Sequence, residues 1–287
     1  MRAVSATKAA RKSDYGNAVG TILPTAFFVA KGNEMAGQLD GKVALITGSG
    51  RGMGRAHALE MAGRGADIMI HDVKKAEADE AADAVRKLGR KVLVSYADVT
   101  DIDAMAKYAA EGEKKLGRID ILVNNAGIGA ERSGIAEVTP EWFQNMFDIH
   151  VKGTFFTTKA VVPGMKERKQ GKILLVSSMW AMTGNAYGAT YSAAKGAILA
   201  LTKSWAKEFA PWNICVNAVA PGSVYSQMVI ERDGLEAAQK RWDLIPLKRP
   251  AQVEEIAYSV AFLCSPESDF ITGQVLSQNG GMAIVGI

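Results

Sequence analysis

Cysteine and histidine are scarce in this chain of 287 residues, and their placement argues against several kinds of site. The two cysteines, Cys215 and Cys264, each lie in an apolar sequence and form neither a disulfide framework nor a zinc-ligand spacing. We therefore expect both thiols to be reduced and buried, as in a protein of the cytoplasm. The three histidines, His57, His71 and His150, are scattered, so the sequence predicts no metal site.

Long apolar runs and clusters of one charge are also missing. No apolar segment reaches the length of a transmembrane helix, so we expect no membrane as a partner. The net charge is only +4, and no basic run alternates with aromatic residues, which argues against nucleic acid as a partner. A composition of 48% hydrophobic and 22% charged residues is typical of a globular enzyme.

The first 38 residues differ in character from the rest of the chain. Residues 1–34 are basic and poor in acids, and they contain a short apolar patch that Gly20 and Pro24 interrupt. A targeting peptide is one interpretation, but the patch is short and Phe28 and Ala30 make a poor cleavage site. Met35 begins a sequence typical of a natural start, so we favour a disordered or misassigned leader over residues 1–38.

From residue 42 onward, apolar runs typical of buried strands alternate with helical patterns. The predicted strands cover residues 43–47, 67–71, 91–96, 119–124, 172–177, 213–219 and 274–277. The predicted helices cover residues 55–64, 75–88, 102–116, 140–167, 191–209 and 253–264. This alternation predicts an α/β fold, doubly wound, with a parallel sheet between two layers of helices. No change of composition interrupts it, so we expect residues 39–287 to form one domain.

A glycine-rich turn lies between the first predicted strand and the first predicted helix. Its pattern is Gly-x-x-x-Gly-x-Gly, because Met53 occupies the place that the last glycine of Gly-x-Gly-x-x-Gly would need. Glycines let a backbone approach a pyrophosphate closely, and a helix N-terminus offers unpaired N–H groups to it. The candidate cofactor-binding residues of this turn are Gly48, Ser49, Arg51, Gly52, Met53 and Gly54.

Asp72 ends the second predicted strand, where a carboxylate can accept hydrogen bonds from an adenosine ribose and repel a 2′-phosphate. Lys74 and Lys75 follow closely and partly offset that repulsion. We therefore expect NAD rather than NADP as the cofactor. Further candidates for cofactor binding follow the third and fourth strands: Asp98, Val99, Asn125, Ala126 and Gly127.

Tyr191 and Lys195 are four residues apart, so on a helix they lie on the same face. A free phenol has a pKa of about 10, which a neighbouring ammonium lowers toward neutrality. Such a pair can act as a general acid and base, although tyrosine and lysine at this spacing are also common surface packing. Ser178, thirteen residues before Tyr191, could hydrogen-bond a carbonyl oxygen that faces the same phenol.

Taken together, these stretches resemble the short-chain dehydrogenase/reductase family over about residues 39–287. The motifs follow in family order: Thr47-Gly-x-x-x-Gly-x-Gly54, Asn124-Asn-Ala-Gly127, Ser178, Tyr191-x-x-x-Lys195 and Pro221-Gly222. The resemblance implies a Rossmann-type sheet of seven parallel strands, a bound NAD(P) and the reversible oxidation of an alcohol to a carbonyl. It also implies dimers or tetramers, and we expect a homotetramer.

The resemblance assigns roles to particular residues. Tyr191 would be the proton donor and acceptor, Lys195 would assist it and hold the nicotinamide ribose, and Ser178 would hold the substrate oxygen. The segment beside the nicotinamide carboxamide would comprise Pro221, Gly222, Val224 and Ser226.

Two residues depart from the family pattern. His150 stands where the family usually has an asparagine that holds a water between the lysine and solvent. Our hypothesis is that His150 keeps this proton relay and adds pH sensitivity, because histidine titrates near 6.5; packing between helices is the alternative. Asn279 stands where many relatives have aspartate, at a position that is more often structural.

The expected pocket wall is apolar. It combines Met179, Trp180, Met182 and Tyr187 with residues 225–242, which include Met228 and Trp242. Residues 226–245 are predicted to form a helical lid, and an apolar alcohol or ketone is the expected substrate.

Three functions remain open from the sequence. The first is an NAD-dependent oxidoreductase that interconverts a secondary alcohol and a ketone. The second is an NADPH-dependent 3-oxoacyl-carrier-protein reductase, against which Asp72 argues. The third, from another class, is a nucleotide-sensing protein without catalysis, which the fold alone does not exclude.

Overall fold

The computed structural model describes residues 37–131, 133–226, 229–231 and 234–285. Most of the expected leader and Met228 of the expected pocket wall lie outside these residues. Gln38, which precedes the expected boundary at residue 39, contacts the rest of the fold. The side chain of Gln38 accepts a hydrogen bond from Arg64 at 3.2 Å and donates one to Glu267 at 3.2 Å.

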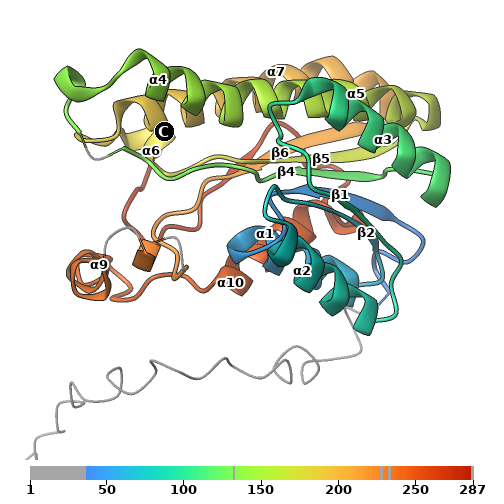
Figure 1. The fold of residues 1–287 in the computed structure, drawn as a ribbon, viewed down its shortest axis with the longest axis horizontal. Coiled ribbons are helices and arrows are strands. Elements are labelled where there is room, and N and C mark those ends of the chain that lie inside the picture. The colour runs from blue at the N-terminus through green and yellow to red at the C-terminus, as the bar shows by residue number, and fades with distance from the viewer. Residues whose placement is uncertain (1–36, 132, 227–228, 232–233, 286–287) are drawn as a thin grey trace, which may run out of the picture. The chain divides into compact units, whose positions relative to one another are not determined.

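Seven strands form one parallel sheet in the order β3-β2-β1-β4-β5-β6-β7 (Figure 1). The strands are β1 (Val43–Thr47), β2 (Asp67–His71), β3 (Val92–Ser95), β4 (Ile121–Asn124), β5 (Gly171–Val176), β6 (Ile214–Val219) and β7 (Val275–Leu276). The predicted Rossmann-type fold is confirmed. Because β1 pairs with both β2 and β4, the chain crosses from one half of the sheet to the other beside β1.

Two layers of helices cover the sheet, as Figure 1 shows. One face carries α1 (Gly52–Gly63), α2 (Lys75–Lys87) and α10 (Val253–Leu263). The other carries α3 (Ile102–Leu116), α4 (Pro140–Phe147), α5 (Gly153–Arg168) and α7 (Ala189–Phe209). Two short helices, α6 (Trp180–Thr183) and α9 (Leu235–Trp242), follow the ends of β5 and β6.

The strands read as continuous apolar runs because both of their faces are buried. In β1, Ala44 and Ile46 belong to the core under α1, α2 and α10, whereas Val43 and Leu45 belong to the core under α3, α5 and α7. Alternate side chains of a strand point to opposite faces, so one short strand supplies both cores. This double burial fixes the register of the strands and therefore the positions at which they end.

Local signals fix where the helices begin and end. Asp101 caps α3 by accepting a hydrogen bond from the Ala104 amide, and Gly117 ends this helix in the left-handed conformation. Thr139 caps α4 in the same way, and Pro140 occupies its first turn. None of the described helices is long and apolar enough to cross a membrane.

Two predicted helices differ from the observed ones. The helix predicted over residues 140–167 is divided into α4 and α5 by a π-helical turn, Asp148–Lys152. A π turn contains one extra residue, which the apolar periodicity of this segment does not reveal. Among the described residues of the lid predicted over 226–245, residues 229–231 and α9 are helical, and Gly234 turns the chain with a φ of 73° just before α9.

His57 is a buried histidine of α1, and no contact in the described part of the fold requires a polar side chain at this position. It is fully buried, and neither ring nitrogen has a hydrogen-bond partner among the described residues. Burial lowers its pKa from 6.5 to about 3. The folded protein therefore binds this proton only near pH 3, whereas the unfolded chain binds it near pH 6.5.

We expect His57→Leu and His57→Gln to reduce the acid sensitivity of the protein. Stability that the neutral imidazole contributes above pH 6.5 is lost progressively as the pH falls toward 3. At pH 5 this loss amounts to roughly 2 kcal/mol, which neither variant should show. Urea unfolding at pH 7.5 and pH 5 measures it, with Tyr258→Phe on the exposed face of α10 as control. Equal pH dependence in the variants and the unaltered protein would contradict the expectation.

Candidate active site

The candidate residues gather at the carboxyl ends of β1, β2, β4, β5 and β6. In parallel sheets these ends lie at one edge, and ligands bind where the chain changes direction, here between β1 and β4. The turns after these five strands carry the glycine-rich segment, Asp72, the Asn125–Gly127 segment, Ser178 and Pro221 respectively.

The glycine-rich turn is shaped to hold an anion at the start of α1. Gly48 and Gly52 have φ values of 62° and 55°, and a Cβ on Gly54 would lie 2.0 Å from the carbonyl oxygen of Gly48. Helix α1 has no side-chain cap and no acidic residue in its first turn. Its N–H groups and the positive end of its dipole are therefore directed at the space where a pyrophosphate would lie. Arg51, Gly52 and Met53 line this helix start.

Ser49 has a different role from the other residues of this turn. Its side chain is fully buried, its hydroxyl donates to Ile46 at 2.8 Å, and it accepts a hydrogen bond from the His71 amide at 3.1 Å. Its own amide donates to the carbonyl oxygen of His71. Ser49 thus joins the glycine-rich turn to the end of β2. A direct contact of Ser49 with the cofactor stays a prediction.

Thr47 joins the two loops on either side of the point where the sheet changes direction. Its hydroxyl oxygen accepts hydrogen bonds from the amides of Asn125 and Ala126, each at 3.0 Å. The Asn125 side chain donates to the carbonyl oxygens of Thr47 and Gly48 at 2.9 and 3.0 Å. A Cβ on Gly48 would lie only 2.9 Å from the Cα of Ala126. The Asn124-Asn-Ala-Gly127 motif therefore holds the glycine-rich turn in place.

Asp72 lies beside the glycine-rich turn, as the position after β2 requires. Its carboxylate accepts hydrogen bonds from the amides of Gly50 and Lys74, each at 3.0 Å. Nearby, Glu77 forms ion pairs with Arg51 at 3.4 Å and with Lys74 at 3.2 Å. Arg51 and Lys74 are thus both paired with the same glutamate.

Of the two candidate residues after β3, Asp98 stabilises the turn and Val99 packs in the interior. The Asp98 carboxylate accepts hydrogen bonds from the amide and the hydroxyl of Thr100, both at 2.8 Å. Val99 is buried, and a Cβ on Gly153 would lie 3.0 Å from its methyl groups. Gly153 begins α5, so this contact brings the turn after β3 close to the helix that follows His150.

Ser178, Tyr191 and Lys195 are brought together by hydrogen bonds between the end of β5 and α7. The Lys195 ammonium donates to the carbonyl oxygen of Val176 at 2.8 Å, and the Ser177 hydroxyl donates to the carbonyl oxygen of Lys195 at 2.8 Å. The Lys195 nitrogen lies 5.7 Å from the centre of the Tyr191 ring. Ser178 accepts a hydrogen bond from the Trp180 amide at 3.3 Å, and a serine in this state can still donate its own proton.

Burial controls the protonation of Lys195. The side chain is 4% exposed, and burial lowers the pKa of its ammonium to about 7. Close to neutrality this group can gain or lose its proton, unlike an exposed lysine. Perturbed titration of this kind is common at sites of proton transfer.

His150 lies in the π-helical turn and is 2% exposed. Its ring meets the Tyr191 ring edge to face, with 5.5 Å between their centres. The Nε2 atom lies 3.2 Å from the amide nitrogen and 3.1 Å from the carbonyl oxygen of Ile128. The Nδ1 atom is buried and has no partner among the residues that the structure describes.

The predicted pH sensitivity of His150 near 6.5 is wrong. Burial, and then the charge of Lys195, lower the pKa of His150 well below its usual value. The imidazole is therefore neutral at physiological pH and can accept or donate a hydrogen bond without changing charge. The place in a proton relay stays a proposal, which the unpartnered Nδ1 supports.

The segment after β6 lies against Ser178 and the C-terminal turn. The Met179 amide donates to the carbonyl oxygen of Pro221 at 3.0 Å, and a Cβ on Gly222 would lie 2.8 Å from the Cα of Asn279. The side-chain amide of Asn279 donates to the carbonyl oxygen of Ala283 at 2.9 Å. An aspartate could not make this last bond, so the departure at Asn279 concerns the local turn and not the chemistry.

The lid segment carries its own small apolar core. Ala238, Trp242 and Ile245 are buried together, and the Tyr225 ring lies 5.4 Å from the Trp242 ring. On the other wall, Trp180 meets the Tyr191 ring edge to face at 5.9 Å, whereas Tyr187 is exposed. The expected apolar wall is therefore present in part, and Arg51 reaches the lid through an ion pair with Glu231 at 3.4 Å.

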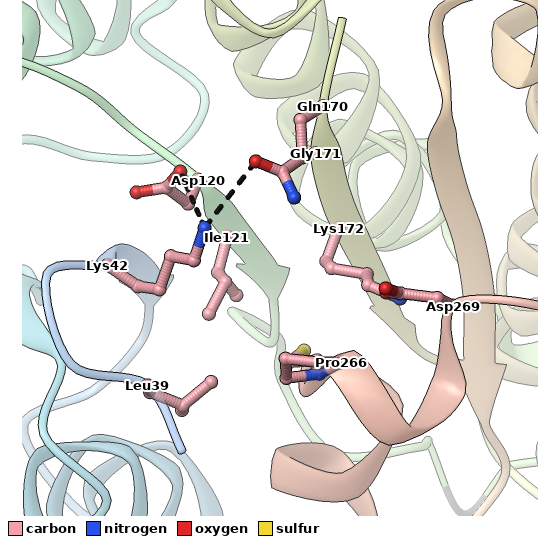
Figure 2. A pocket seen from close by; sticks show the side chains of 10 residues that line it. Leu39, Lys42, Asp120, Ile121, Gln170, Gly171, Lys172, Pro266 and Asp269 are labelled. Atoms are coloured by element: carbon pink, nitrogen blue, oxygen red, sulfur yellow. Dashed lines mark hydrogen bonds and ion pairs between the residues drawn. The ribbon is translucent and has the colours of Figure 1, made fainter. Parts of the chain in front are cut away.

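A small cavity of about 50 Å³ lies at the opposite edge of the sheet, between the starts of β1, β4 and β5 (Figure 2). Lys42 is directed toward Asp120 and Gln170, at 3.9 and 3.5 Å, and Lys172 pairs with Asp269 at 2.7 Å (Figure 2). The charged side chains that line the cavity are paired with one another, and the cavity volume suits only one or two waters. Among the described residues, no group of histidine, cysteine and carboxylate side chains could hold a metal ion.

The sequence also identifies the class of protein by comparison with known families. Residues 48–283 match the family described as enoyl-(acyl carrier protein) reductase, which covers most of the chain. This chain belongs to the short-chain dehydrogenase/reductase family. It is accordingly an NAD(P)-dependent oxidoreductase that acts on CH–OH groups, which argues against the third candidate from the sequence, a nucleotide sensor without catalysis.

Three relatives illustrate the range of the family. The 3-oxoacyl-[acyl-carrier-protein] reductase FabG of Thermotoga maritima is 38% identical over 247 residues, 86% of this chain and 100% of that protein. The 7alpha-hydroxysteroid dehydrogenase of Escherichia coli K12 is 32% identical, over 85% of this chain and 95% of that protein. The crystal structure of an NAD⁺-bound xylitol dehydrogenase superposes with a TM-score of 0.82 at 32% identity, over 85% of this chain and 99% of that one.

We expect Gly127→Ala to destabilise the protein by about 1–3 kcal/mol, the usual cost of overpacking. The added Cβ would lie 2.4 Å from the His150 ring, which the π-helical turn and Tyr191 hold in place. Thermal unfolding of Gly127→Ala, His150→Asn and the double variant measures the coupling. Because asparagine is smaller, the alanine should cost less in the His150→Asn background. Strictly additive effects would show that the two positions do not compete for this space.

Proposed function

We propose that the protein is an NAD-dependent oxidoreductase that interconverts a secondary alcohol and a ketone. The observation that carries the proposal is the buried Lys195 ammonium, 5.7 Å from the Tyr191 ring and bonded to the end of β5 just before Ser178. A phenol, an ammonium and a hydroxyl that converge at the carboxyl edge of this sheet suit proton transfer to an alcohol oxygen. The residues around Gly48–Gly54 and Asn125–Gly127 would hold the cofactor.

The proton chemistry belongs to the residues of this chain. Ser178 donates a hydrogen bond to the substrate oxygen, while Tyr191 takes the hydroxyl proton in the oxidative direction and returns it in the reductive one. Lys195 stabilises the phenolate by its charge, and the neutral His150 would hold, through Nδ1, a water that relays the proton without a change of charge on the ring. When bound, the nicotinamide supplies or accepts the hydride. Pro221, Gly222, Val224 and Ser226 would border the carboxamide.

The charges around Asp72 favour NAD. The Asp72 carboxylate faces the glycine-rich turn, where the adenosine ribose of a cofactor would lie, and it would repel a 2′-phosphate. Arg51 and Lys74, the cations that could bind such a phosphate, are both paired with Glu77. The solved xylitol dehydrogenase similar to this chain binds NAD⁺, which agrees with this assignment.

Reduction of a 3-oxoacyl group on an acyl carrier protein, with NADPH, is the second candidate. Its support is the 38% identity to the Thermotoga maritima reductase over the whole of that protein. The two candidates share the proposed catalytic residues, so they differ in the cofactor and in what the lid segment accepts. The apolar walls around Trp180 and Tyr225–Trp242 suit an apolar substrate in either case.

We expect Tyr191→Phe to lower kcat by roughly 10²–10⁴-fold, because the phenol hydroxyl is the proton donor and acceptor. Formation of NADH from a panel of secondary alcohols measures turnover, and quenching of the protein's tryptophan fluorescence by NADH measures cofactor binding, which the variant should keep. Tyr258→Phe on the exposed face of α10 is the matched control. Full turnover by Tyr191→Phe would remove Tyr191 from the chemistry.

We expect kcat/KM to be higher with NAD than with NADP, and Asp72→Asn to shift that ratio toward NADP by about tenfold. Glu77→Gln should shift it in the same direction, because it releases Lys74 from its ion pair and leaves Arg51 paired with Glu231 alone. Asp83→Asn, at an exposed ion pair of α2, is the control. A preference of the unaltered protein for NADP, together with turnover of a 3-oxoacyl substrate, would favour the second candidate.

A further inference from the structure

Glu131 is a buried carboxylate that the proposed chemistry does not use. It lies in the loop between β4 and α4, seven residues after Asn124, and its exposed fraction is 7%. No cation is paired with it among the described residues. A charged group in such a place costs free energy unless hydrogen bonds compensate it, so its partners indicate its role.

The partners of Glu131 are the first amides of the helix that carries Tyr191. One carboxylate oxygen accepts a hydrogen bond from the Thr190 amide at 2.6 Å, and the other accepts one from the Tyr191 amide at 3.3 Å. Helix α7 begins at Ala189, and its N-cap residue, Gly188, has no side chain to offer. Glu131 therefore supplies from another loop the cap that the helix lacks, and its charge faces the positive end of the helix dipole.

The same loop is bonded to the cofactor turn and to His150. The amides of Asn125 and Ala126 donate to Thr47, and the Ile128 amide lies against the His150 ring. Within seven residues, the chain thus contacts the glycine-rich turn, the π-helical turn and the start of α7. Through Glu131, this loop sets the distance between the cofactor loops and the backbone of Tyr191.

We propose that Glu131 is a positioning residue for the reaction. It holds the backbone of Tyr191 in the position from which the phenol reaches the substrate oxygen. The inference rests on the proposed role of Tyr191. Two hydrogen bonds to successive amides fix both the rotation and the shift of the first helical turn, which a single capping bond would leave variable. A misplacement of about 1 Å in such a group can cost up to 10²-fold in rate.

Three substitutions separate the geometry from the charge. Glu131→Gln keeps the length but can accept only one of the two amides with its single oxygen, and we expect kcat to fall about tenfold. Glu131→Ala removes both bonds and should lower kcat about 100-fold. Glu131→Asp keeps the charge but is one methylene shorter, so it should behave like the alanine variant. The KM for NAD should stay unchanged. With an alcohol deuterated at the carbinol carbon, the kinetic isotope effect on kcat should rise, because the hydride-transfer step becomes slower than product release.

The matched control is Asp101→Ala, which removes the side-chain cap of another helix, α3. It should lower Tm without changing kcat or the isotope effect. Glu131→Gln with unaltered kcat and isotope effect would overturn the inference, as would an active Glu131→Asp. Tyr191→Phe in the same assays distinguishes the two levels: if it keeps turnover, the proposed function fails, and if it is inactive while Glu131→Gln is normal, only the role of Glu131 fails.

Discussion

The structure of the site depends on one buried cation. Lys195 lies in the interior between α7 and the end of β5, where its ammonium donates to the carbonyl oxygen of Val176. Removing a charged group from water is costly, and here that cost appears as a pKa lowered to about 7. Lys195 lies beside Tyr191, and its charge adds to the burial of His150 in keeping that imidazole neutral. Helix α7, the end of β5 and the π-helical turn must therefore pack in an arrangement that accommodates the buried side chain of Lys195.

Much of the fold and part of the site could be predicted from the sequence, for a physical reason. Strands buried on both faces leave unbroken apolar runs, and turns that approach a phosphate leave glycines, so both can be recognised locally. The π-helical turn, the inward role of Ser49 and the cap by Glu131 could not. The extra residue of the π turn does not show in the apolar periodicity, whereas the contacts of Ser49 with His71 and of Glu131 with Thr190 join segments distant in the chain. The pKa of His150 was mispredicted because burial, not residue type, determines it.

The family resemblance explains the shared machinery but not the substrate. Relatives of this chain include proteins named for acyl, steroid and polyol substrates, although their identities to it lie between 32% and 38%. The segment after β6 is built apart from the sheet, because Ala238, Trp242 and Ile245 form a core separate from the two that enclose the sheet. Such a unit can change sequence without disturbing strand packing.

The π-helical turn at Asp148–Lys152 has a consequence for how this chain tolerates insertions and deletions. A π turn is equivalent to a helix with one residue added, and each residue of an α-helix turns the chain by about 100°. Loss of one codon within this turn would convert it to a regular helix and rotate α4 by that angle against α5. Thr157 and Val161 of α5 could stay on the sheet, but Met146 of α4 would leave its buried position. Such a deletion would preserve the reading frame of the gene but would remove α4 from its packing beside the turn that carries His150.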